Sequence, residues 1–256
     1  MSVVAVDWSG RKGGERRHLW TAEAHDGQLL RLVAGRTRTE VIDELVARAD
    51  EDAGVVVGFD FSFSLPEWFL RDRGYVNTRA LWDAAATDGE SWLRDCEPPF
   101  WGRPGRRRPE LPAHLRGTEA ALAAVGGIRP KSSFQIGGAG SVGTGSVRGF
   151  PELARLQDAG FAIWPFDAPA QPPVAVEIWP RALTGPVVKS DATARAAYLD
   201  HHLPEIECEL RDAAVGSEDA FDAAVSAVVM SHHEANLRTL PTLDDARLEG
   251  CVWGPE

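Results

Sequence analysis

Three acidic side chains stand at or near the ends of three short β-branched runs, and this feature most constrains the fold. They are Asp7 in VVAVDWSG, Asp60 in VVVGFDFSF and Glu177 in VAVEIWPR. A charged side chain in a buried strand is unfavourable unless something pairs with it. In open α/β sheets, ligands bind at the carboxyl ends of the strands. The sequence therefore predicts that these acids converge at the carboxyl ends of strands and form a functional site.

The hydrophobic periodicity around these acids predicts an α/β fold. Three strands, a helix and a strand come first, an irregular segment follows, and strands and helices then alternate again. The Asp26-Gly27 pair is typical of a hairpin between the second and third strands. The expected strands are 3–6, 17–24, 28–33, 55–60, 161–166, 174–179 and 248–253, and the expected helices outside the irregular segment are 37–50, 151–159, 191–202 and 217–236.

The irregular segment runs from about residue 65 to 148. It is rich in tryptophan, proline and glycine, and helices are expected within it at 66–72, 78–93 and 118–124. We interpret it as an insertion or cap over the site, within a single domain of residues 1–256.

A fourth acidic segment, SEDAFDAAVSA, begins a helix. Asp219 and Asp222 are three residues apart and share one face of it. The helix is otherwise small and apolar, so we expect it to pack closely on the sheet and bring these acids toward the strand ends. Each acid also has a simpler explanation. In that case Asp7 and Asp60 cap turns. Asp219 is then stabilised by the positive N-terminal end of the helix dipole, and Asp222 lies on the helix surface.

Carboxylates that converge from separate segments suit Mg²⁺ or Mn²⁺. Two such ions activate water and stabilise the leaving oxygen in phosphoryl transfer. The predicted catalytic residues and metal ligands are therefore Asp7, Asp60, Glu177 and Asp219, with Asp222 as a further ligand.

Possible phosphate contacts lie in the glycine-rich run KSSFQIGGAGSVGTGS, where Lys131, Ser133 and Gln135 are predicted to bind substrate. Its backbone N–H groups would form an anion-binding nest, although it lacks the Gly-Lys-Ser/Thr of a Walker A motif. A flexible loop over the substrate is the alternative. Arg181 is also predicted to bind substrate or to form a structural ion pair. The one dense basic patch, 103–108, lies beside Phe100 and Trp101 and suits either phosphate contact with stacking or a solvated loop.

The composition narrows the class of protein. The chain has 27 Lys and Arg against 38 Asp and Glu, a formal net charge of -11. This argues against a general nucleic-acid coat protein, which needs a basic surface. The three cysteines are far apart, which disfavours a disulfide framework or a cysteine zinc site. The pairs His201-His202 and His232-His233 are adjacent on helices, so each pair points apart and shares no metal. We expect a cytoplasmic protein, since neither a signal peptide nor a membrane helix is apparent.

The segments VVAVDWSG, GFDFSFSLP, VEIWPRAL, SEDAFDAAVSA and EGCVWGPE together resemble the domain-of-unknown-function family four-twenty-nine. That family is described as predicted nucleases of ribonuclease H-like fold. The order of three strands, a helix and a strand also resembles this fold, with Asp7 on the first strand and Asp60 on the fourth. The resemblance implies an α/β, ribonuclease H-like mixed sheet flanked by helices, with an insertion after the fourth strand. It carries the family's predicted acids over to Asp7, Asp60, Glu177 and Asp219 or Asp222.

The expected function is a metal-dependent nuclease or phosphodiesterase that acts on nucleic acid or on a small phosphorylated substrate. Two alternatives stay open. Asp7-Trp8-Ser9-Gly10 is similar to the strand-end Asp and Gly turn of sugar kinases and actin-like ATPases, which suits an ATP-binding phosphotransferase. A non-catalytic protein that binds a ligand through its tryptophan-rich segment is the other.

Overall fold

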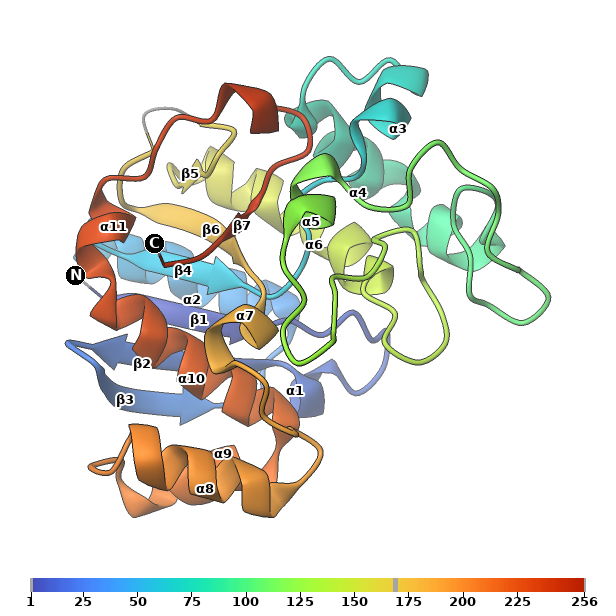
Figure 1. The fold of residues 1–256 in the computed structure, drawn as a ribbon. Coiled ribbons are helices and arrows are strands. Elements are labelled where there is room, and N and C mark those ends of the chain that lie inside the picture. The colour runs from blue at the N-terminus through green and yellow to red at the C-terminus, as the bar shows by residue number, and fades with distance from the viewer. Residues whose placement is uncertain (1, 168–169, 256) are drawn as a thin grey trace.

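A mixed seven-stranded sheet forms the centre of the molecule (Figure 1). The structure is a computed structural model that describes residues 2–167 and 170–255, so Glu256 at the end of the EGCVWGPE motif lies outside the described residues. The strand order is β3-β2-β1-β4-β6-β5, and β7 also pairs with β6. The strands are β1 (Val3–Asp7), β2 (Trp20–His25), β3 (Gln28–Val33), β4 (Val56–Phe59), β5 (Ala162–Ile163), β6 (Val174–Ile178) and β7 (Val252–Trp253).

The first three strands form an antiparallel meander, and the remaining pairs are parallel. Strands β1, β4 and β6 lie side by side and run in the same direction, so their carboxyl ends meet at one edge of the sheet. The α/β class, the mixed sheet and the flanking helices agree with the sequence prediction.

Helices cover both faces of the sheet (Figure 1). Val4 and Val6 of β1 pack in one core cluster with α2, α4 and α6, whereas Val3 and Ala5 pack in the other with α10. Burial on both faces explains why these strands are continuous apolar runs. The helices are α1 (Glu15–His18), α2 (Arg38–Glu51), α3 (Glu67–Asp72), α4 (Thr78–Asp95), α5 (Gly117–Ala121), α6 (Gly143–Asp158), α7 (Pro180–Thr184), α8 (Ala192–His202), α9 (Cys208–Gly216), α10 (Glu218–His232) and α11 (Glu234–Arg238), with the 3-10 helix η1 (Asp244–Ala246).

Side-chain caps fix several helix starts. Thr37 accepts a hydrogen bond from the Glu40 backbone N–H in a capping box at the start of α2, and Asp191 and Ser217 cap α8 and α10. The expected helix at 217–236 divides into α10 and α11, and α7 and α9 were not predicted. The expected strands at 17–24 and 161–166 are shorter, since Glu15–His18 forms α1 and only Ala162–Ile163 pairs in β5.

The end of the glycine-rich run is helical, because α6 begins at Gly143 and not near residue 151 as expected. Close packing explains these glycines. A Cβ at Gly143 would lie 2.0 Å from the Ser133 carbonyl oxygen, and one at Gly149 would lie 2.3 Å from the Phe61 ring. Glycine weakens a helix by about 1 kcal/mol relative to alanine, and here that cost allows α6 to approach the Ser133 backbone and the loop that follows β4.

The segment from about 65 to 148 contributes to the layer that covers the sheet as well as to loops at its edge. It supplies α4, whose Trp82 is completely buried in the same core cluster as Val4 and Val6. Helices α4 and α6 pack against each other. Within the described part of the chain, no helix is both long enough and apolar enough to span a membrane.

Candidate functional site

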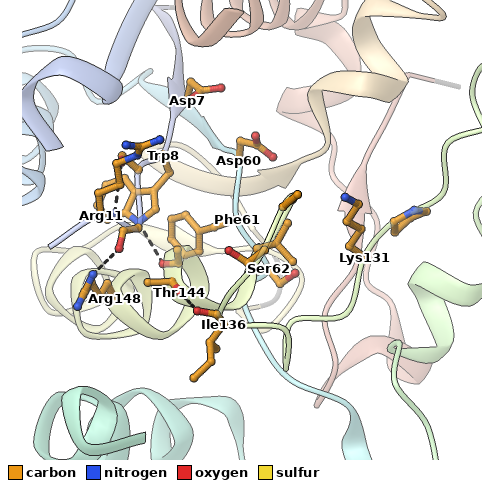
Figure 2. Close-up of a pocket in the computed structure, with 18 of the residues that line it drawn as sticks. Asp7, Trp8, Arg11, Asp60, Phe61, Ser62, Lys131, Ile136, Thr144 and Arg148 are labelled. Atoms are coloured by element: carbon orange, nitrogen blue, oxygen red, sulfur yellow. Dashed lines mark hydrogen bonds between the residues drawn. The ribbon is translucent and has the colours of Figure 1, made fainter. Parts of the chain in front are cut away.

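A cavity of about 1160 Å³ opens at the carboxyl ends of β1, β4 and β6. Its walls also include the loop that follows β1 and the loops between α4 and α6 (Figure 2). Hydrogen bonds join these walls. The Trp8 indole N–H donates to the Gly145 carbonyl at 3.2 Å, and the Thr144 hydroxyl donates to the Ile136 carbonyl at 3.0 Å. The strand ends and α6 therefore form one wall.

Asp7 and Asp60 lie next to each other in this cavity (Figure 2). Val6 of β1 pairs with Phe59 of β4 in parallel register, and the Asp60 backbone N–H donates to the Val6 carbonyl at 3.1 Å. The register therefore places each aspartate at the same level of its strand. The sequence prediction that these acids meet at strand ends is confirmed for this pair.

The two carboxyls disfavour each other's ionisation. Burial, followed by the neighbouring charge of Asp60, raises the pKa of Asp7 well above its usual range. Burial and the charge of Asp222 raise the pKa of Asp60 to about 7. Lys189 lowers both pKa values but does not cancel these effects. A like charge nearby and low exposure to water both favour the neutral acid.

Helix α10 brings the two further acids to this edge. The Asp222 side chain is buried and contacts the Lys189 ammonium through Oδ2, while its Oδ1 has no hydrogen-bond partner among the described residues. Asp219 lines the cavity, and its Oδ2 lies 3.1 Å from Nδ1 of His18. We call Asp7, Asp60, Asp219 and Asp222 the aspartate cluster.

Glu177 belongs to a different group of charges. Both of its carboxylate oxygens contact the completely buried Arg116 guanidinium, and Oε2 also accepts the Phe63 backbone N–H at 2.9 Å. Arg116 binds Glu119 as well, at 2.8 Å. Burial raises the pKa of Glu177, and the contact with Arg116 opposes that shift. We call Arg116, Glu119 and Glu177 the arginine-centred cluster.

The sequence prediction made Glu177 a metal ligand, but its oxygens are already bound by protein donors. Arg116 and Lys189 were missed. Arg116 lies 61 residues from Glu177, and Lys189 lies 33 residues from Asp222. No local pattern marks either cation. The Arg-x-x-Glu spacing of Arg116 and Glu119 was the one available signal, and it equally describes an exposed helical pair.

The donor set of the aspartate cluster fits a divalent cation held jointly with substrate. A metal held by three protein side chains needs three ligand atoms close together. Among the described residues, the His, Cys, Asp and Glu side chains place three ligand atoms within 4.8 Å of one another in one group, His25, Asp26 and Glu234. That group lies outside the cavity. The aspartate cluster therefore does not present three converged carboxylates. Mg²⁺, however, usually takes one or two carboxylates together with substrate phosphate. Asp7 and Asp60 provide two carboxyls whose mutual repulsion a cation would relieve.

The predicted substrate contacts divide into two groups. Lys131 and Arg181 line the cavity. Arg181 also donates through Nη1 to the carbonyls of Gly185 and Val187, which fixes its position.

The other two predicted contacts stabilise the loop instead. Gln135 donates through Nε2 to the Gly137 carbonyl at 3.2 Å and is not part of the cavity lining. Ser133 is completely buried and also lies outside the lining, so the structure does not bring it to the cavity as predicted.

The basic patch at 103–108 is not a single surface. Arg103 lines the cavity, whereas Arg106 pairs with Glu97 at 2.6 Å and Arg108 lies over the Trp101 ring. Within this patch, Arg103 is therefore placed to contact a ligand in the cavity.

Comparison of the chain with protein-family models, curated proteins and solved structures gives no match.

Proposed function

We propose that this protein is a metal-dependent hydrolase of phosphodiester bonds with a ribonuclease H-like fold. One observation carries the proposal. Asp7 and Asp60 stand side by side on paired parallel strands, face a large cavity that also contains lysines and arginines, and repel each other's charge. Two carboxylates whose ionisation is disfavoured until a cation arrives, next to cations that suit phosphate, are the requirements of this chemistry.

The order of the strands supports the proposed fold. An antiparallel meander of β1, β2 and β3 is followed by β4 parallel to β1, with an acid at the ends of β1 and β4. This is the arrangement implied by the resemblance to family four-twenty-nine. Membership of that family is part of the same proposal.

The chain's own residues have separate roles. Asp7 and Asp60 would hold Mg²⁺ or Mn²⁺, which supplies a Lewis acid for a phosphate oxygen and lowers the pKa of a water molecule. Lys131 and Arg181 would bind substrate phosphate from the cavity wall. Asp222, anchored by Lys189, adds negative charge behind the pair and so strengthens its attraction for a cation.

The test is hydrolysis of an oligonucleotide and of bis-p-nitrophenyl phosphate by purified protein with Mn²⁺. The Asp7→Asn variant should lose more than about 100-fold in rate, because even outer-shell partners of metal ligands contribute about 10–100-fold. Asp83→Asn is the matched control, since Asp83 is exposed on α4 and pairs with Arg79. Hydrolysis that persists in EDTA, or in Asp7→Asn, would contradict the proposal. Calorimetric binding of ATP with Mg²⁺ and no hydrolysis would favour the phosphotransferase alternative.

A further inference from the structure

Positive charge is concentrated in the cavity of an otherwise acidic protein. The lining contains eight Lys or Arg residues and five Asp or Glu residues, whereas the whole chain has a net charge of -11. The cations are Arg11, Lys12, Arg103, Arg129, Lys131, Arg148, Arg181 and Lys189. An anion is therefore attracted to the cavity and repelled by much of the remaining surface.

Four of these cations have no protein partner. The side chains of Arg11, Arg103, Arg129 and Lys131 form no hydrogen bond or ion pair with any described residue, and all four are exposed. By contrast, Arg148 and Lys12 in the same cavity both contact Glu90. The four come from three separate loops, so they present several separated positive charges to one ligand.

Apolar surface lies among these cations. Ile128 and Val142 are 43% and 36% exposed, and both line the cavity together with Trp179. Large exposed hydrophobic side chains beside unpaired cations suit a ligand that alternates anionic and flat apolar groups. Nucleic-acid strands have this character, and proteins that bind single strands combine a positive groove with apolar or aromatic surfaces for the bases.

The size and charge of the cavity argue against two other ligands, a mononucleotide and a nucleic-acid duplex. Pockets for small ligands enclose about 300–1,000 Å³, and this cavity of about 1160 Å³ exceeds that range. A mononucleotide would leave most of the four cations unused. A rigid duplex cannot bend successive phosphates into a cavity at the edge of the sheet, whereas a flexible single strand can.

We propose that the cavity binds a single-stranded polynucleotide, with several consecutive phosphates held by Arg11, Arg103, Arg129 and Lys131 and with bases against Ile128, Val142 and Trp179. This inference rests on the proposed function, since it names the substrate class of the same site. Binding through these cations needs no metal. It is therefore measurable separately from hydrolysis.

The experiment measures the fluorescence anisotropy of labelled twelve-nucleotide dT and U strands in EDTA at 50–200 mM salt. The Arg103→Ala/Arg129→Ala/Lys131→Ala variant should bind at least about tenfold more weakly than the wild type. Its slope of log affinity against log salt should be shallower by about 2, because each phosphate contact to a single strand contributes about 0.7. The matched control is Arg71→Ala/Arg73→Ala/Arg94→Ala, which removes equal charge from exposed positions outside the cavity and should bind within twofold of the wild type.

Unlabelled competitors complete the test. Single strands should compete at much lower concentration than dTMP or a duplex of equal length, and the two labelled strands show whether DNA or RNA is preferred. Equal competition by dTMP or by the duplex would overturn the inference, as would equal weakening by both triple variants or no binding at all. Strand binding as expected, without Mn²⁺-dependent hydrolysis, would overturn the proposed function and leave the strand-binding inference supported.

Discussion

Two clusters of acids share the carboxyl edge of the sheet, and they differ in what neutralises them. In the arginine-centred cluster, a completely buried guanidinium binds Glu177 and Glu119. In the aspartate cluster, Lys189 contacts Asp222, and the Asp7 and Asp60 side chains have no hydrogen-bond partner among the described residues. Glu177 and Asp7 stand in similar strand sequences. A β-branched run that ends in an acid therefore locates the edge of the sheet where the acids gather. It does not show whether that acid is bound by a protein cation or left unpaired.

The arginine-centred cluster connects distant segments of the fold, whereas the aspartate cluster holds charge that the protein only partly neutralises. Arg116 also donates to the Glu249 carbonyl at 2.8 Å, so it connects β6, α5 and the C-terminal segment. Asp7 and Asp60 are left with a repulsion that costs stability while no cation is bound. Stored repulsion of this kind is common at functional sites, where perturbed pKa values concentrate.

The largest expected effect comes from breaking the arginine-centred cluster. Arg116→Met should reduce the free energy of unfolding by about 3–5 kcal/mol, because two buried carboxylates lose their shared cation. Urea denaturation at pH 7 measures it. Arg106→Ala, which breaks an exposed pair with Glu97, should cost less than about 1 kcal/mol.

If Arg116→Met does not fold, Arg116→Lys provides the measurement. Lysine keeps the charge but cannot form the same forked contacts, so an intermediate loss is expected. A loss below 1 kcal/mol in both variants would contradict the structural role of Arg116.

The second effect separates the clusters by their response to metal. At a concentration of Mn²⁺ about 100-fold above its Kd, binding should stabilise the wild type by about 2.7 kcal/mol. Asp60→Asn should lose this response. Glu177→Gln, although less stable, should keep it, because the oxygens of Glu177 are bound to Arg116 and Phe63. Thermal unfolding with and without Mn²⁺ tests this, and an equal loss in both variants would place Glu177 among the metal ligands.

The smallest effect concerns pH in the absence of metal. The pKa of Asp60 is raised from 3.8 to about 7, so the folded state binds this proton more tightly than the unfolded state. Stability therefore falls as the pH rises from about 4 to 7. Asp60→Asn removes this loss. The full shift would correspond to about 4 kcal/mol at about 1.4 kcal/mol per pKa unit, but Asp60 lines an open cavity where solvent screens its charge, so we expect the variant to be about 1–2 kcal/mol more stable than the wild type at pH 8.

The difference between the two proteins should disappear near pH 4, where Asp60 is protonated. Urea unfolding at pH 4, 6 and 8 provides the comparison, with Asp83→Asn as the control outside the cavity. If the wild type is instead more stable than Asp60→Asn at pH 8, nearby cations such as Lys189 neutralise the Asp60 charge, and the prediction is contradicted.

Much of the backbone was predictable because local rules determine it. Runs such as Val3–Val6 are apolar on both faces, and they form strands covered on both sides. Asp26-Gly27 joins β2 and β3 as expected. Gly143 and Gly149 of α6 were not predictable, since close contact with Ser133 and Phe61 selects glycine there against its low helix propensity.

The sequence alone placed Asp7 and Asp60 at the ends of strands, because the apolar runs before them fix those positions, whereas the pairing of β1 with β4 is a result of the tertiary structure. Only the tertiary structure decided which acids are neutralised. Arg116 and Lys189 reach Glu177 and Asp222 from loops far along the chain. Local periodicity specifies a residue's face and element but not its distant partner, and the charge state of a buried acid depends on that partner.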